Sequence, residues 1–394
     1  MGFVYSIDKD IHQTIAMKIN EGLAFPEKIK LQKAVLYTFN AKPRKQIWKD
    51  GTGKVQKTWT FTPWLRVYDT DGNCGEGPVS PEVWKTILPL MLADPEPRTN
   101  LEWRKLFYWK ERANTAFFGA MSQMEMILFD LIARKRGIPV HRLLGAQKDW
   151  ADVYKGGGSV LRTDEELIEE ILGIREEGFT CTKIKISIGD MSRDLRRLEK
   201  LRLAVGPDFK IAVDSNQAWD ADTCMQFVRE AYAYDLAWYE EPILHTETEE
   251  ISRFIRQMKE EDLYIPVDYG ESARQFPVFK SYIDAGVEYI TVHPFLYSLA
   301  ETLSIADYAR SRGCKVTTGQ NDFPGVLAGA LMKPGEAVEY HKPNTEYIEQ
   351  YYSLKPSFKD GKMWLPQVPG LPVRVDLKKL EADGCLANIQ YFYR

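Results

Sequence analysis

The sequence predicts an α/β protein: a barrel of eight parallel strands with helices outside it, preceded by a smaller α+β domain. From about residue 152 onward, short apolar strands alternate with helical stretches, which is typical of a parallel sheet covered by helices. Eight such strand–helix units close into a barrel. The first 150 residues instead begin with strands and continue with helices, as α+β domains do.

The first domain, 1–150, opens with two strand patterns at 31–39 and 58–69. The polar stretch 41–57 between them is expected to be a loop. Helical patterns dominate from about 81 to 145. The barrel is assigned to 151–345. The remaining segment, 346–394, is rich in proline and aromatic residues and is expected to pack back on the first domain.

The elements of the barrel follow from apolar runs bounded by turn residues and from helical periodicity. Strands are expected at 153–159, 181–187, 210–214, 235–240, 264–269, 287–292, 314–318 and 336–340. Helices are expected between them, at 164–176, 191–205, 221–233, 248–260, 273–285, 299–312 and 324–332.

The composition narrows the class of protein. A net charge of −4 gives no support for a nucleic-acid partner or an anionic membrane surface. The sequence contains no apolar run of transmembrane length and no signal-peptide pattern. Five scattered cysteines indicate a reduced, cytoplasmic protein without a disulfide framework or zinc site.

Three acidic residues follow successive barrel strands at the spacing of one strand–helix unit. Asp214, Glu240 and Glu271 are 26 and 31 residues apart, and Lys185 precedes Asp214 by 29. Each is expected at the carboxyl end of a strand, where barrel enzymes carry their chemistry. Singly, each could be a helix cap or a loop acid. Together, they predict a site for a hard divalent cation such as Mg²⁺.

Lys183 and Lys185 are two residues apart on one predicted strand, so their side chains share a face. That face is expected to be the barrel interior, since the isoleucines that alternate with them would face the helices. Buried ammonium groups need carboxylates or a bound anion. Desolvation is expected to lower the pKa of at least one lysine, toward use as a base. The alternative is an edge strand with two solvated lysines.

Further candidates lie at other strand ends and in the early polar stretch. His293 is expected to point into the barrel, as an acid/base group or as a hydrogen-bonded structural histidine. Asn216 shares the face of Asp214 and is a candidate for substrate binding, as is Gln320 after the seventh strand. Arg44 and Lys45 belong to a basic stretch, which is either a lid that attracts an anionic substrate or a solvated loop.

With these residues in place, the chain resembles the enolase superfamily, in particular its mandelate racemase/muconate lactonizing subgroup. The resemblance is carried by residues 120–145, by the Lys-x-Lys pair at 183–185, by Tyr-Glu-Glu-Pro at 239–242 and by Gly-Glu-Ser at 270–272. It implies a modified (β/α)7β barrel and a capping domain completed by the C-terminal tail. It also implies Mg²⁺ on the three acids, Lys185 as the base that removes a proton next to a substrate carboxylate, and Lys183 as the partner of that carboxylate.

The departures from the family pattern bear on the reaction. Phe295 stands where racemases of this subgroup carry an aspartate, no histidine occurs in 294–340, and no lysine occurs in 286–300. We therefore expect dehydration of a sugar acid (an aldonate or aldarate) to a 2-keto-3-deoxy acid, with His293 as a possible acid. The alternatives are a racemase, epimerase or cycloisomerase, or a non-catalytic metal-binding scaffold or sensor. The resemblance also implies a small-molecule carboxylate substrate and a homo-oligomer.

Overall fold

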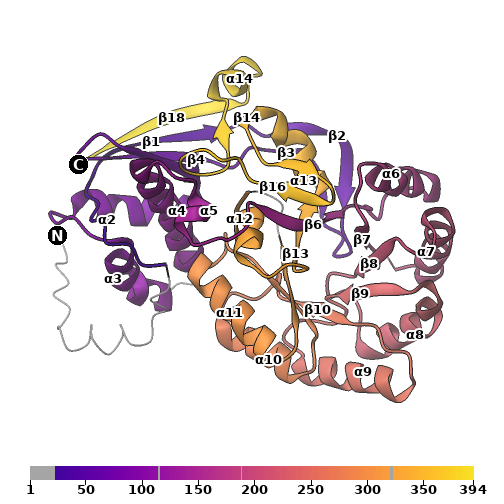
Figure 1. Ribbon diagram of the computed structural model, residues 1–394. Coiled ribbons are helices and arrows are strands. Elements are labelled where there is room, and N and C mark those ends of the chain that lie inside the picture. The colour runs from indigo at the N-terminus through magenta and orange to yellow at the C-terminus, as the bar shows by residue number, and fades with distance from the viewer. Residues whose placement is uncertain (1–22, 114–115, 188, 320–322) are drawn as a thin grey trace.

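The computed structural model describes residues 23–113, 116–187, 189–319 and 323–394. Figure 1 shows two parts: a cap that contains both ends of the described chain, and a barrel of strands ringed by helices. Within the described residues, no helix combines the length and apolar character needed to cross a membrane.

The predicted barrel is confirmed. Eight parallel strands of the described chain pair in sequence order, and the eighth pairs with the first to close the ring. They are β6 (Trp150–Gly156), β7 (Cys181–Lys185), β8 (Lys210–Asp214), β9 (Leu236–Glu240), β10 (Val267–Tyr269), β11 (Tyr289–Val292), β12 (Lys315–Thr318) and β13 (Ala337–His341). Because all eight run in the same direction, their carboxyl ends meet at one mouth.

The helices between the strands begin at clear sequence signals. Thr163 and Glu166 form a reciprocal capping box at the start of the first helix. Asp190 and Asp220 cap the next two. The helices are α6 (Asp164–Glu176), α7 (Met191–Val205), α8 (Ala221–Ala231, followed by the short η2, Tyr232–Tyr234), α9 (Thr248–Glu260), α10 (Phe276–Asp284), α11 (Leu299–Ser311) and α12 (Phe323–Leu331). Their apolar faces cover the outside of the barrel.

The cap is a four-stranded antiparallel sheet with helices against it. Its strands are β1 (Leu31–Phe39), β4 (Trp64–Asp69), β5 (Cys74–Pro78) and β18 (Leu386–Tyr393), in the order β18-β1-β4-β5. Its helical segments are η1 (Val83–Ile87), α2 (Leu88–Ala93), α3 (Asn100–Ala113), α4 (Ala116–Arg136) and α5 (Val140–Leu143). Figure 1 shows β18 lying along β1, so the tail completes the cap as expected.

The tail also contacts the barrel. Between β13 and β18 it forms α13 (Lys342–Ile348), η3 (Glu349–Tyr351), β14 (Tyr352–Leu354), β15 (Ser357–Lys359), β16 (Lys362–Trp364), β17 (Arg374–Val375) and α14 (Leu377–Ala382). β16 pairs antiparallel with β6, which extends the barrel sheet by a β15–β16 ribbon. The tail therefore joins the two parts of the molecule.

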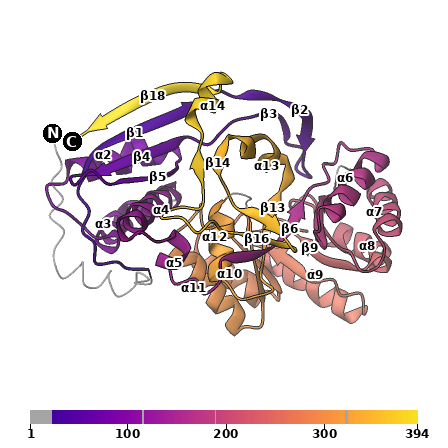
Figure 2. The ribbon, with the colours of Figure 1, turned by 45° about the horizontal axis from the view of Figure 1, so that its top comes forward.

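The expectation of a loop at 41–57 is wrong, because this stretch forms an antiparallel hairpin of β2 (Lys42–Lys49) and β3 (Val55–Trp59). Most of its side chains are exposed on both faces, so the hydrophobic alternation of a half-buried strand is missing. Trp48 is the buried exception. Figure 2 shows the hairpin reaching from the cap toward the α6 side of the barrel.

The tip of the hairpin is docked on the barrel mouth. The backbone N–H of Lys49 donates to Ser159 Oγ at 3.0 Å, just beyond β6. A Cβ added at Gly51 would lie 2.6 Å from Ser187 Oγ and 2.8 Å from the carbonyl oxygen of Ser215. A glycine at position 51 therefore lets the hairpin backbone press against the loops that follow β7 and β8.

Candidate active site

The three predicted acids come together at the barrel mouth. Asp214 and Glu240 end β8 and β9, and Glu271 follows β10. Each offers a carboxylate oxygen, and the three oxygens lie within 4.8 Å of one another. Asp214 and Glu240 are buried, and Glu271 is partly exposed. Three converging carboxylates match the oxygen ligands that Mg²⁺ takes in proteins.

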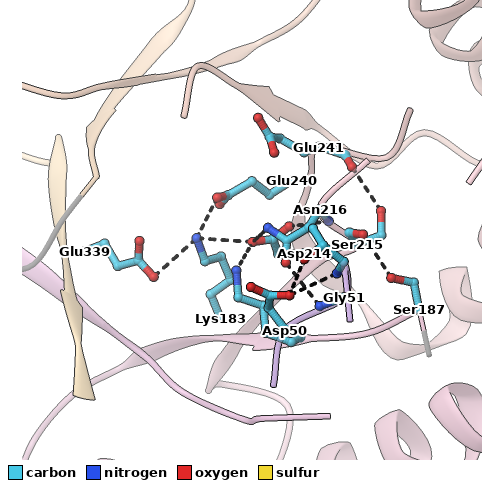
Figure 3. A network of polar contacts seen from close by, with 12 residues as sticks. Asp50, Gly51, Lys183, Ser187, Asp214, Ser215, Asn216, Glu240, Glu241 and Glu339 are labelled. Atoms are coloured by element: carbon cyan, nitrogen blue, oxygen red, sulfur yellow. Dashed lines mark hydrogen bonds and ion pairs between the residues drawn. The ribbon is translucent and has the colours of Figure 1, made fainter. Parts of the chain in front are cut away.

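Both lysines of β7 point into this cluster. Lys183 Nζ lies 2.6 Å from Glu240 Oε1, 3.3 Å from Glu339 Oε1 and 3.8 Å from Asp214 Oδ2. Figure 3 shows it between Glu240 and Glu339, beside Asp214. Lys185 bonds to Asp214 Oδ2. The interior placement predicted from the spacing of the two lysines is what the structure shows, and it makes the site a network of opposite charges.

The expected direction of the lysine pKa shift is wrong in this arrangement. Burial lowers the pKa of Lys183, but the charges of Glu240 and Glu339 outweigh burial and raise it. The pKa of Lys185 is likewise raised, because the Asp214 carboxylate outweighs burial. The carboxylates that surround each ammonium group favour its charged form more than burial disfavours it.

The carboxylates themselves show that the cluster is rich in negative charge. Burial raises the pKa of Glu240, and the neighbouring Asp214 adds to the rise despite Lys183. Burial also raises the pKa of Glu271, against the charge of Lys185. Carboxyl groups that are costly to ionise together are stabilised by a divalent cation, so the donor set fits Mg²⁺.

Asn216 supports the cluster from the loop after β8. Its backbone N–H donates to Asp214 Oδ1 at 2.7 Å, and its Nδ2 donates to Asp214 Oδ2 at 3.1 Å. Its Oδ1 accepts the backbone N–H of Gly51 at 3.3 Å (Figure 3). Asn216 thus orients Asp214 and holds the hairpin tip, while its contact with substrate stays a prediction.

His293 lies just beyond β11 and is buried. Neither ring nitrogen has a hydrogen-bond partner within the described residues. Its backbone N–H donates to Tyr297 Oη at 2.6 Å, which fixes the turn that carries it. Burial and the charge of Arg274 lower the pKa of His293 to about 3. The imidazole is therefore neutral near pH 7, which disfavours its use as an acid that stores a proton.

The other residues predicted to bind substrate have no described contact with the carboxylate cluster. Arg44 serves the hairpin, with Nε donating to the Thr58 carbonyl oxygen and Nη2 to Gln56 Oε1, each at 3.0 Å. The side chain of Lys45 is exposed. Gln320 lies outside the described residues. The substrate-binding roles of Arg44, Lys45 and Gln320 stay predictions.

Sequence reasoning missed two residues of β13, Glu339 and His341. The charges of Lys183 and Lys185 outweigh burial and lower the pKa of Glu339 to about 2, so it is a second anion on Lys183. His341 packs edge-on against the Trp48 ring, with centroids 5.2 Å apart. The two are two residues apart in a strand, the same spacing that identified Lys183 and Lys185.

The residues at the barrel mouth lie in a region that the chain shares with a known protein family. A family model described as enolase C-terminal domain-like matches residues 166–379, more than half of the chain. The chain belongs to the enolase superfamily. The matched span contains the two lysines and the three acids, so the residues assembled at the mouth are part of the family region.

Among the relatives of this superfamily member are two dehydratases. The chain is 26% identical over 267 residues to the L-talarate/galactarate dehydratase of Salmonella typhimurium, covering 64% of this chain and 62% of the relative, less than two thirds of that protein's length. It is 25% identical over 303 residues to the arabinonate dehydratase of Saccharolobus solfataricus, covering 73% and 78%. Other relatives are named epimerases and cycloisomerases.

Solved structures agree on the fold. The L-talarate dehydratase of Polaromonas sp. JS666, crystallised with Mg and L-glucarate, superposes with a TM-score of 0.75 at 20% identity, over 93% of this chain and 99% of that one. The likeness therefore extends over the cap as well as the barrel.

Proposed function

We propose that this chain is a Mg²⁺-dependent enzyme that removes the proton next to a substrate carboxylate, and that it dehydrates a sugar acid to a 2-keto-3-deoxy acid. The observation that carries the proposal is the meeting of Asp214, Glu240 and Glu271 within 4.8 Å, with both lysines of β7 in the same cluster. The names of two relatives as sugar-acid dehydratases support the substrate class.

Asp214, Glu240 and Glu271 would hold the metal ion. Bound there, Mg²⁺ would stabilise the negative charge that develops on the substrate carboxylate as the neighbouring proton leaves. Asn216 keeps Asp214 in place through two hydrogen bonds, and so preserves the spacing of the ligands.

The two lysines have different neighbours and are assigned different roles. Lys183 is enclosed by Glu240 and Glu339, so it stays charged and pairs with the substrate carboxylate. Among the carboxylates of the described residues, Lys185 forms an ion pair with Asp214 alone. Once Asp214 is engaged in holding the metal, the Lys185 amine is available as a base.

The proposed reaction balances with Lys185 alone. Lys185 takes the proton from the carbon next to the carboxylate, and the C–O bond at the following carbon breaks. The hydroxyl leaves as water with a proton returned by the same ammonium group. The resulting enol converts to the 2-keto acid. His293 is not required as an acid, which agrees with its neutral form.

The test is incubation with Mg²⁺ and a panel of aldonates and aldarates, followed by measurement of 2-keto acid. We expect product from at least one acid, and no product after EDTA treatment or in Lys185→Ala. If no acid yields product with wild-type protein, the dehydratase proposal fails for that panel.

An epimerase or cycloisomerase is the second candidate, favoured by the unpaired imidazole of His293 and by relatives with those names. Exchange of the substrate α-proton in D₂O without loss of water would identify it. Absence of both product and exchange would leave the non-catalytic scaffold. A cytoplasmic location and a homo-oligomer stay predictions.

A further inference from the structure

Gly319 directly follows β12, the seventh barrel strand, and faces the side chain of His293. A Cβ added at Gly319 would lie 2.0 Å from His293 Cε1 and 2.3 Å from Nε2. Gly319 is not among the described residues with positive φ. Its backbone therefore tolerates other residues, and the demand for glycine here comes from the space that the imidazole ring occupies.

The strand order places this ring across the barrel from Lys185. β7 is the second strand and β11 the sixth in a closed ring of eight described strands. Strands four apart in such a ring are diametrically opposed. His293 and Lys185 therefore approach the mouth from opposite sides, with the carboxylates of β8, β9 and β10 along one arc between them.

The ring of His293 is also buried, within electrostatic reach of the charged cluster. It is 2% exposed, and Glu339 and Lys183 are among the charges that act on it. Within the described residues, both of its nitrogens lack partners although the side chain is buried. A buried imidazole with no hydrogen bond at either nitrogen is destabilising. A bound ligand that forms a hydrogen bond with one of these nitrogens would offset this cost.

We propose that Gly319 is a positioning residue: by leaving its space to the His293 imidazole, it lets β11 deliver a proton-transfer group to the side opposite Lys185, above the end of β12. The proposal deepens the proposed function and rests on it for the identity of the reaction. His293 would accept the proton from the face of the α-carbon that Lys185 does not reach. The C–H bond breaks, its electron pair stays with the substrate, and the proton moves to an imidazole nitrogen.

The first test needs no substrate. Protein carrying ¹⁵N-labelled histidine has five ring spin systems, and the His293 resonances are those lost in His293→Ala. We expect Gly319→Ala to shift or broaden the His293 resonances and to leave the other histidines unchanged. The matched control is Gly173→Ala, at a glycine of α6 with no atom within 4 Å of an added Cβ. Unchanged His293 resonances in Gly319→Ala would overturn the proposal.

A double-mutant cycle distinguishes a specific clash with His293 from a general folding defect. Gly319→Ala should lower the melting temperature in the wild-type background and have no such effect in His293→Ala, where the ring is gone. Equal losses in both backgrounds would show that the added methyl group clashes with something other than His293, and the proposal would be wrong.

The role in proton transfer is tested with two acids that differ only at the carbon next to the carboxylate, D-gluconate and D-mannonate. In D₂O, Gly319→Ala and His293→Ala should both reduce α-proton exchange or turnover of one acid by roughly 100-fold or more, with KM little changed, and spare the other acid. Lys185→Ala should abolish turnover of the acid that Gly319→Ala and His293→Ala spare. Equal effects on both acids would overturn the opposite-side role. If wild-type protein acts on neither, the proposed function fails for these acids, while the histidine resonances and the cycle still decide whether Gly319 positions His293.

Discussion

At the barrel mouth, the positive charges of the two lysines compensate the negative charges of the buried carboxylates. Lys183 is within 4 Å of three carboxylates, and Lys185 bonds to one. Removal of either lysine leaves carboxylates buried with fewer counter-charges, which is costly unless a cation replaces the lost charge. Substitutions in this cluster therefore need Mg²⁺ present if their effect on chemistry is to be separated from their effect on stability.

The substitution Lys185→Ala should abolish α-proton abstraction while the folded structure is retained in excess Mg²⁺. We expect loss of at least 100-fold in 2-keto acid formation, since general-base catalysis contributes about that much or more. Circular dichroism and melting temperature report folding. The control is Lys200→Ala on α7, which removes an exposed ion pair with Asp164 and should keep activity. Full activity in Lys185→Ala would rule out its role as base.

Asp268 makes stability depend on pH. Burial raises its pKa to about 7, against about 4 in an unfolded chain, while the Thr291 hydroxyl donates to it. Between these values the folded state holds a proton that the unfolded state has lost, so its contribution to stability falls as pH rises from about 4 to 7. The variant Asp268→Asn should flatten this fall and be the more stable protein at pH 8.

The measurement for Asp268 is urea unfolding of EDTA-treated protein between pH 5 and 8. Each pH unit over which the two states differ by one proton changes the free energy of unfolding by about 1.4 kcal/mol. Asp208→Asn, at an exposed aspartate, should keep the wild-type slope. An unchanged slope in Asp268→Asn would contradict the assignment.

At the scale of elements, the alternation of a strand decides which side chains reach the mouth. It allowed Lys183 and Lys185 to be placed from the sequence, because Ile184 and Ile186 alternate with them. The same alternation in β13 marks Glu339 within the strand expected at 336–340, but its contact with Lys183 becomes visible only when the barrel is closed. The hairpin was missed because its strands bury so little that no pattern records their pairing.

The substitution Tyr347→Phe should loosen the hairpin without removing the aromatic ring. Tyr347 Oη accepts the backbone N–H groups of Lys45 at 3.0 Å and Gln46 at 3.5 Å. Loss of this acceptor costs about 1–2 kcal/mol locally, or roughly 5- to 30-fold faster amide exchange at Lys45. Tyr391→Phe on the exposed β18 is the control. Equal exchange in wild type and Tyr347→Phe would show that the hydroxyl does not hold the hairpin.

For the whole molecule, the fold class followed from the sequence because each strand–helix unit repeats the same apolar pattern. Some residues of the barrel mouth could also be predicted from the sequence, because Asp214, Glu240 and Glu271 lie at strand ends that converge there. The packing of His293 over Gly319 did not follow, because two positions on neighbouring strands give no local sign that a ring fills the space between them. Long-range contacts of this kind are visible only once the barrel is closed.

Mg²⁺ should stabilise the entire fold by mass action. At a free concentration 100-fold above the dissociation constant, a ligand that binds only the folded state adds about 2.7 kcal/mol. We expect the melting temperature to rise with Mg²⁺ in the wild type and in Asp208→Asn, and to stay constant in Asp214→Asn. A full response in Asp214→Asn would place the ion elsewhere.

The pairing of β18 with β1 has a consequence for how the protein is made. The backbone N–H of Asn40 donates to the Cys385 carbonyl oxygen, and its side chain reaches Gly384, 344 residues away. A ribosome needs roughly 20–70 s to add that many residues. Throughout that time the β1 edge lacks its β18 neighbour and presents unpaired backbone groups. Chains released before β18 is made would keep this edge exposed, and an exposed strand edge is a template for pairing with another chain.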